Sequence, residues 1–429
     1  MRQQSSNMPD MRGKTMMEDL PEEIIIDQIL IRLSPKDIGR CRAVHMLWYT
    51  ATSTPKFMID HHRRQPLLPI IDGDGKPASV VIFRDGHAGA KSSSEDLWPF
   101  FLRLGRKFRS EIRLHTSCDG FLIVSHEGKF YIDNPVTRKH GLLPQPQSGQ
   151  EFYNTIIGLY QHHPTGEYRV LWVSGNMDKD NWYGNLSTVK SYILTVGSSQ
   201  SRCIGVREST SSSPLAEETF DLSNCMYRCN HNPPVHYRAN LHWSYCRFKD
   251  STAGTGRIIV FDTTVESYRW MRGPHVGFWE KLLDIKGTLA FASCSVPNLT
   301  IIDVWVIHDY DAQTWSFKYR IDMSIIEASR TLGLSSFEGK KGKKQLSGTI
   351  VKFFNDIVVL NENELLIGFN SKYVLHCTTE GKFLQIVRIS KRQYCMELTR
   401  HCLQESIMPI PSSPIQEENE ESRYAIENV

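Results

Sequence analysis

The first sixty residues carry a helical pattern of apolar positions. In the stretch LPEEIIIDQILIRL, Ile25, Ile29 and Leu33 recur every fourth residue, the spacing that places side chains on one face of an α-helix. Asp19 can cap the first turn, and Pro21 is tolerated within it. Further apolar residues lie off the stripe at Ile24, Leu30 and Ile31. The pattern therefore predicts a helix that is apolar on more than one side.

A second helix start follows in the letters SPKD. Ser34 is a typical capping residue, Pro35 is favoured at the first helical position, and Asp37 completes a shortened capping box. Apolar residues continue at helical spacing as far as Trp48, and TSTP at 52–55 ends the run. The spacing predicts a second amphipathic helix that packs against the first.

Together these signals predict a module of three short helices over residues 18–62. Chains of about 40 residues usually need a partner or a covalent staple to fold. The module also holds more large apolar residues than so small a core can bury. We therefore expect part of its surface to dock onto another protein.

The pattern changes at about residue 66. Short runs rich in Val, Ile, Phe, Tyr and Trp follow one another, separated by Gly, Pro, Asn and Asp; examples are CDGFLIVS, YRVLWVSG, GRIIVFDT and TIIDVWVIHDYD. No helix-period stretch of comparable strength competes with them. Residues 66–410 are therefore predicted to form an all-β domain, with too many strands for one open sheet.

A weak internal repeat runs through this domain. An apolar strand enters a tight polar turn and a second strand returns with an aromatic or apolar anchor, as in FYIDNPVTRKHGLL, IIVFDTTVESYRWM, WVIHDYDAQTWSFKY and LHCTTEGKFLQIV. We expect Asp or Thr to build the turns, and Trp270, Trp315 and Phe383 to pack back on the sheets. Radial repetition of such hairpins is typical of a β-propeller. A β-sandwich is the alternative.

Composition narrows the choice of partners and compartment. Of 429 residues 40% are hydrophobic and 23% charged, and the formal charge is +3, so we expect neither nucleic acid nor a membrane as partner. The polar, Met-rich start (1–17) and the Glu-rich end (411–429) are predicted to be disordered. The start lacks the apolar run of a signal peptide, and ten scattered cysteines fit reduced thiols. We expect an intracellular protein, cytoplasmic or nuclear.

The chain shows little candidate chemistry. Its densest Cys and His region could be considered for zinc, but the ligands lack the paired spacing of structural zinc sites, and buried thiols and loop histidines are the favoured interpretation. The residues concerned are Cys225, Cys229, His231, His236, His242 and Cys246. G-x-S-x-G, H-E-x-x-H and Walker A motifs are missing from the sequence, and paired carboxylates such as Asp309 and Asp311 fall in a predicted turn. We expect no catalytic residues, no metal and no cofactor.

The helical module resembles an F-box, the module that docks onto the Skp-type adaptor of cullin-based ubiquitin ligases. The resemblance rests on Leu20 and Pro21, ILIRL at 29–33, RCRAV at 40–44 and Trp48. The predicted docking residues are Leu20, Pro21, Ile29, Leu30, Leu33, Val44 and Trp48. Alternatively, several of them, especially Leu33 and Val44, only hold the helices together.

The remainder resembles the F-box-associated domain of plant F-box proteins. The blocks that carry this resemblance include IDNPVTRK, HHPTGEYRVL, RANLHWSY and LTRHCLQESIMPIP, in order along residues 110–411. The chain is thus expected to be an α+β multidomain protein, a small three-helix F-box followed by a large all-β domain.

The two resemblances together imply a non-catalytic substrate-recognition subunit of a Skp–cullin–F-box E3 ubiquitin ligase. The F-box would bind the Skp-type adaptor and, through it, the cullin and RING subunits, while the β domain would present a target protein that the sequence does not identify. The alternative function is a propeller-type binding module for a small ligand or glycan without a role in a ligase.

Overall fold

A computed structural model of the chain describes residues 20–73, 76–82, 93–96, 113–145, 152–177, 186–204, 233–245, 257–274, 279–294, 300–335, 354–370, 373–387 and 396–411. The predicted disorder at 1–17, and all but the first residue of that at 411–429, lie outside these residues.

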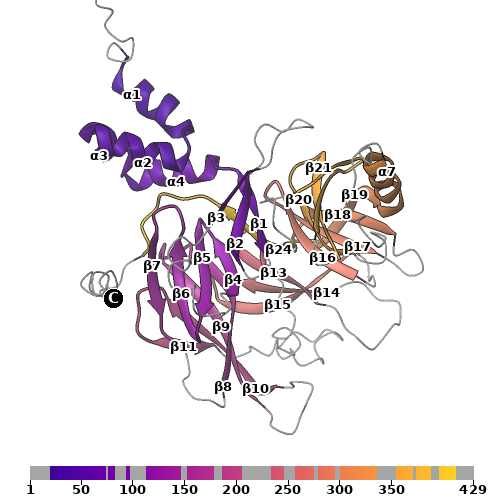
Figure 1. Cartoon of the computed structure of the whole chain (residues 1–429). Helices are drawn as coiled ribbons and strands as arrows, with labels where there is room; N and C mark the ends of the chain where they lie inside the picture. Colours follow the sequence, from indigo (N-terminus) through magenta and orange to yellow (C-terminus); the bar gives the residue numbers. More distant parts are fainter. Residues whose placement is uncertain are drawn as a thin grey trace, which may run out of the picture.

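The described part of the chain begins with a group of short helices that stands beside a larger β structure (Figure 1). The helical elements are α1 (Glu22–Ile24), η1 (Ile25–Ile29), η2 (Leu30–Arg32), α2 (Pro35–Val44), α3 (Met46–Thr52) and α4 (Pro55–Arg64). The first three follow one another without a gap, as α-helical, π-helical and 3-10 turns, and form one continuous helical segment.

The predicted start of the second helix is confirmed. The Ser34 hydroxyl accepts a hydrogen bond from the backbone N–H of Asp37 at 3.2 Å and donates one to the Asp37 carboxylate at 2.7 Å. Thr54 and Pro55 repeat the device at α4, where the Thr54 hydroxyl accepts from the N–H of Phe57. The structure has more helices than the three predicted, because extended backbone at His45 separates α2 from α3 and α4 follows.

The β domain contains six four-stranded antiparallel sheets in the described part of the chain. The first two comprise β24 (Met396–Gln404), β1 (Leu67–Gly73), β2 (Lys76–Ile82) and β3 (Ser93–Asp96), then β4 (Arg113–Cys118), β5 (Phe121–His126), β6 (Lys129–Asn134) and β7 (Lys139–Leu143). The next two comprise β8 (Phe152–Gln161), β9 (Tyr168–Met177), β10 (Leu186–Thr195) and β11 (Ser201–Ile204), then β12 (Val235–Tyr237), β13 (Asn240–Tyr245), β14 (Arg257–Asp262) and β15 (Ser267–Arg272). The last two comprise β16 (Trp279–Ile285), β17 (Thr288–Cys294), β18 (Ile301–Asp309) and β19 (Thr314–Asp322), then β20 (Phe354–Val359), β21 (Glu364–Phe369), β22 (Tyr373–Thr378) and β23 (Phe383–Ile386).

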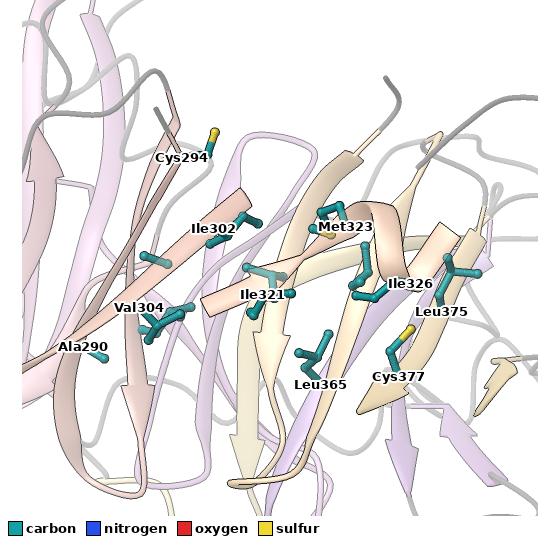
Figure 2. Packing of buried hydrophobic residues seen from close by; sticks show 14 of the residues in the cluster. Ala290, Cys294, Ile302, Val304, Ile321, Met323, Ile326, Leu365, Leu375 and Cys377 are labelled. Atoms are coloured by element: carbon teal, nitrogen blue, oxygen red, sulfur yellow. The ribbon is translucent and has the colours of Figure 1, made fainter. Parts of the chain in front are cut away.

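The packing between the sheets shows that they form a closed ring. A separate cluster of buried apolar side chains lies between each sheet and the next, including one between the last sheet and the first. Figure 2 shows one of them, in which Ile302 and Ile321 of one sheet face Leu365 and Leu375 of the next. This arrangement confirms the predicted β-propeller, with each sheet as one blade.

The two ends of the β domain close the ring through a single strand pair. β24 runs antiparallel to β1, with Leu67 opposite Gln404 and Leu68 opposite Leu403. The first sheet is thus built from both ends of the domain, a pairing that leaves no open gap between the first and the last blade.

The four repeat copies found in the sequence occupy one position in four blades. Each forms the hairpin of the third and fourth strands, namely β6–β7, β14–β15, β18–β19 and β22–β23. The first turn residue is Asn134, Asp262, Asp309 or Thr378, and its side-chain oxygen accepts hydrogen bonds from backbone N–H groups two to four residues further on. The predicted turn chemistry is confirmed, including the structural role of Asp309.

The same turns share a strained backbone position. Arg138, Glu266 and Gln313, each four residues after the turn-forming Asn or Asp, have φ between 54° and 57°, in the left-handed region that non-glycine residues rarely adopt. In the fourth hairpin the positive φ, 95°, falls on Gly381, three residues after Thr378. Three of the four turns therefore keep a common geometry although the residue type differs, which explains why the repeat is weak in sequence.

One helix of the β domain was not predicted. Helix α7 (Met323–Ser335) follows β19 directly, and the Asp322 carboxylate accepts a hydrogen bond from the N–H of Ser324 at its start. Met323 and Ile326 point into the cluster between the last two sheets (Figure 2). Helix α7 thus covers part of that cluster, and the strands of the two sheets cover the rest.

Candidate functional site

The helical module has a small core that it shares with the C-terminal segment of the chain. Ile25, Leu30, Ile31, Ile38 and Phe57 are buried together, and Ile407 joins them from beyond β24. The module therefore completes its core partly on the propeller. It is not a free unit on a linker.

Polar contacts fix the last helix to the propeller. The His62 ring bonds through Nδ1 to the carbonyl oxygen of Glu405 at 3.0 Å, and its Nε2 lies 3.6 Å from the Asp119 carboxylate. Burial raises the pKa of Asp119, but bonds from His62 and Tyr168 outweigh it and hold the pKa below its usual value. The Gln404 amide also donates to the carbonyl of Gln65. These contacts hold the module in one orientation.

The segment after β24 is anchored in turn by the second sheet. Asn134 donates from Nδ2 to the carbonyls of Ser406 and Met408, at 3.1 and 2.8 Å, while its Oδ1 builds the β6–β7 turn. Gly120 lies so close that a Cβ there would meet the Ser406 Cβ at 2.3 Å. The position of the helices is thus set by residues far apart in the sequence.

The predicted docking residues fall into three groups. Leu20, Pro21 and Val44 are exposed, and Val44 has 75% of its surface accessible. Ile29, Leu33 and Trp48 are half-buried; Leu33 and Trp48 pack against the module core.

Leu30 differs from the others. Only 1% of its surface is accessible, at the centre of the module core. In this structure it holds the helices together and presents no surface to a partner.

Of the most exposed apolar group of the module, the sequence reasoning found Val44 and missed the other three residues. Val44, Met46, Leu47 and Tyr49 surround the break between α2 and α3, and each has more than half of its surface accessible. We call these four residues the α2–α3 corner. No other stretch of this length in the described residues exposes as many large apolar side chains. The signal was the run VHMLWY, which is apolar on more faces than one helix can bury.

Side-chain contacts between α2 and α3 hold the α2–α3 corner in place. The Arg42 guanidinium donates from Nε to the Thr52 hydroxyl at 2.9 Å and from Nη2 to the Thr52 carbonyl at 2.5 Å, joining α2 to the end of α3. The Trp48 ring lies against the His45 ring at a tilt of 37°, with 4.8 Å between ring centroids. Because its backbone is fixed, the corner can be covered by a partner without a large loss of conformational entropy.

The Cys and His region considered for zinc gives no metal cluster in the described residues. Both ring nitrogens of His242 are engaged, by the carbonyl of Val235 at 3.1 Å and the hydroxyl of Tyr310 at 2.8 Å. Burial lowers the pKa of His242 to about 4, so its ring is neutral. Cys225, Cys229, His231 and Cys246 lie outside the described residues.

Among the residues that are described, no helix has the length and apolar content needed to span a membrane.

Similar sequences are F-box proteins. One from Arabidopsis thaliana is 23% identical over 311 residues, which are 70% of this chain and 69% of the relative. A second Arabidopsis protein, named as a putative F-box protein, is 26% identical over 324 residues, or 74% of this chain and 71% of its own.

Solved structures match more distantly. An oligogalacturonate lyase in complex with manganese aligns with a TM-score of 0.33 and 9% identity, covering 63% of this chain and 62% of the lyase. An acylaminoacyl peptidase of Pyrococcus horikoshii aligns with a TM-score of 0.34 and 8% identity, covering 75% of this chain and 46% of the peptidase. Alignments this weak carry no argument about activity.

The family comparison is stronger. The family described as "F-box associated beta propeller domain" matches residues 100–392, more than half of the chain. This range includes five complete blades of the ring and all four hairpin turns of the repeat, and the sheet of β24, β1, β2 and β3 lies outside it. The chain belongs to the F-box-associated β-propeller family.

Proposed function

We propose that the chain is a substrate receptor of a Skp–cullin–F-box ubiquitin ligase and that its α2–α3 corner is part of the surface that binds the Skp-type adaptor. The observation that supports this proposal most is the α2–α3 corner, where four large apolar side chains are exposed together on a rigid module. Family membership and the F-box relatives support the assignment.

The energetics of the corner favour a partner. Burying one large apolar side chain stabilises a complex by about 1.5 to 3 kcal/mol before the cost of association. Leu20 and Ile24 of the first helical segment add two further exposed apolar side chains to the module. Interfaces of permanent complexes resemble a domain core cut in half, and the module presents such a half.

In this function the chain supplies proximity and no catalytic group. The propeller binds a target, the module binds the adaptor, and the cullin and RING subunits bring the activated ubiquitin close. Holding the target beside the conjugating enzyme raises the effective concentration of its lysines. The contacts between α4 and the propeller support this role, because they keep the two binding surfaces at a fixed relative orientation.

The test is the affinity of the full chain for a purified Skp-type adaptor. Val44→Ser combined with Leu47→Ser removes apolar surface from the corner and should weaken binding by at least tenfold, since each truncation forfeits about 1 kcal/mol or more. Val265→Ser is the matched control, because Val265 is similarly exposed, at 66%, on the β14–β15 turn. It should leave the affinity unchanged. The proposal fails if the wild-type chain does not bind, or if the double variant binds like the control.

A further inference from the structure

The centre of the propeller contains a cavity that the proposed adaptor docking does not use. Its volume is about 260 Å³. It is lined by first strands of several blades, β4, β12, β16 and β20, and by β24. The residues around it come from seven separate stretches of sequence, which only the closed ring brings together.

Two members of a group of three charged side chains form part of its wall. The Asp356 carboxylate accepts from Lys281 Nζ at 2.5 Å through one oxygen and from Arg400 Nε through the other. Lys281 also donates to the carbonyl of Ile357. Both Lys281 and Arg400 line the cavity. Because two cations share one carboxylate, the group keeps an excess of one positive charge.

The free hydrogen-bonding capacity of this group lies on Arg400. Its Nε is used by Asp356, whereas its two terminal nitrogens have no partner among the described residues. Its side chain is 24% exposed, compared with 9% for Lys281. The end of a guanidinium offers two parallel N–H groups, the arrangement that a carboxylate accepts in a bidentate manner.

The rest of the wall selects the kind of anion. Leu283, Val358 and Leu403 make part of the cavity apolar, while Asp119 and Asp284 add carboxylates. A dianion such as phosphate would meet one excess positive charge and be repelled by these carboxylates. A monoanion at the end of the Arg400 guanidinium is repelled less than a dianion, and a hydrocarbon body matches the apolar wall.

We infer that the central cavity binds a carboxylate, which accepts hydrogen bonds from the terminal nitrogens of Arg400 while its apolar body lies against Leu283, Val358 and Leu403. The carboxylate can belong to a free small acid or to the C-terminus of a polypeptide. The inference deepens the proposed function, since it places a recognition site on the target-binding domain.

The test compares carboxylates with their neutral amides in thermal unfolding of the full chain. One probe set pairs small acids with their amides, such as 3-methylbutanoate with 3-methylbutanamide. The other pairs N-acetylated random hexapeptides carrying a free C-terminus with the same peptides amidated. Carboxylates of at least one set should raise the melting temperature while their amides do not, and the responding set identifies the source.

Arg400→Gln should weaken the response at least tenfold in probe concentration, while Lys281 continues to neutralise Asp356. Arg320→Gln is the matched control, an arginine paired with Asp303 on the outermost strands of a blade, and should respond like wild type. Should Arg400→Gln not fold, Arg400→Lys keeps the positive charge but loses the bidentate end, and should also weaken the response.

Three results would overturn the inference: amides that act like carboxylates, an Arg400 variant that responds like wild type, or no response to any carboxylate at 10 mM. Adaptor affinity is measured on the same preparations. Arg400→Gln should retain it, so that failure at the cavity is distinguished from failure of the proposed ligase role.

Discussion

Replacing Asp356 by Asn gives a sharp test of how the centre of the propeller is held together. The side chain is buried and receives hydrogen bonds from Lys281, from Arg400 and from the backbone N–H of Ile357. Asn has nearly the same shape but no charge. The substitution therefore leaves the two cations without their carboxylate and replaces one acceptor oxygen by an amide NH2, which cannot accept a hydrogen bond from them.

The expected cost follows from the burial of the three groups. Removing one partner of a buried ion pair destabilises a protein by about 3 to 5 kcal/mol, because an uncompensated charge remains. Burial lowers the pKa of Lys281 despite the attraction of Asp356, so this cation is already costly to hold. Arg400 is partly exposed to the cavity, where water can solvate its charge. We therefore expect the lower end of the range, about 3 kcal/mol.

Thermal unfolding of the full chain measures this cost. A loss of about 3 kcal/mol corresponds to a fall of roughly 6 to 12 °C for a domain of 150 to 250 residues, and somewhat less for a larger one. The matched control is Asp303→Asn, which breaks the Arg320–Asp303 pair between two outer strands. That pair is exposed to solvent, so breaking it should cost far less stability than breaking the buried group. A melting temperature for Asp356→Asn within 2 °C of the Asp303→Asn value would refute the reasoning.

Further predictions concern single positions. Burial raises the pKa of Asp133 to about 7, so the folded state retains a proton that the unfolded state loses above pH 4. The contribution of this group to the free energy of unfolding should be full below pH 4 and fall as the pH rises towards 7. Urea titrations at each pH measure this fall, and Asp133→Asn should abolish it. Gly120→Ala should lower the free energy of unfolding by at least about 2 kcal/mol more than Gly166→Ala. Both glycines have a positive φ, but only Gly120 touches the C-terminal segment. Equal losses for the two variants in chemical denaturation would contradict the importance of this contact. Leu30→Ala should destabilise the chain by about 2 to 5 kcal/mol, while adaptor affinity at a temperature where the variant is folded stays within threefold of wild type.

Local chemistry made much of the architecture predictable. The cap at Ser34 was visible because a hydroxyl, a proline and a carboxylate stand at the spacing that a helix start requires. The hairpins were visible because Asn134, Asp262 and Asp309 build turns with their own side chains. Such signals act within a few residues, so a single sequence carries them.

Features that depend on distant residues could not be found in this way. The break at His45 has no proline or glycine to mark it, and α7 starts directly where β19 ends. The cavity is assembled from strands as far apart in the sequence as β1 and β24, for which no local pattern exists. Burial of Leu30 and exposure of Val44 likewise depend on how the helices pack on the segment after β24.

Hydrogen exchange of the full chain, alone and with a purified Skp-type adaptor, tests the central claim most directly. The account predicts that the adaptor slows exchange in α3, residues 46–52, and leaves the β14–β15 turn at 262–267 unchanged. Equal exchange in α3 with and without a saturating adaptor would contradict the account.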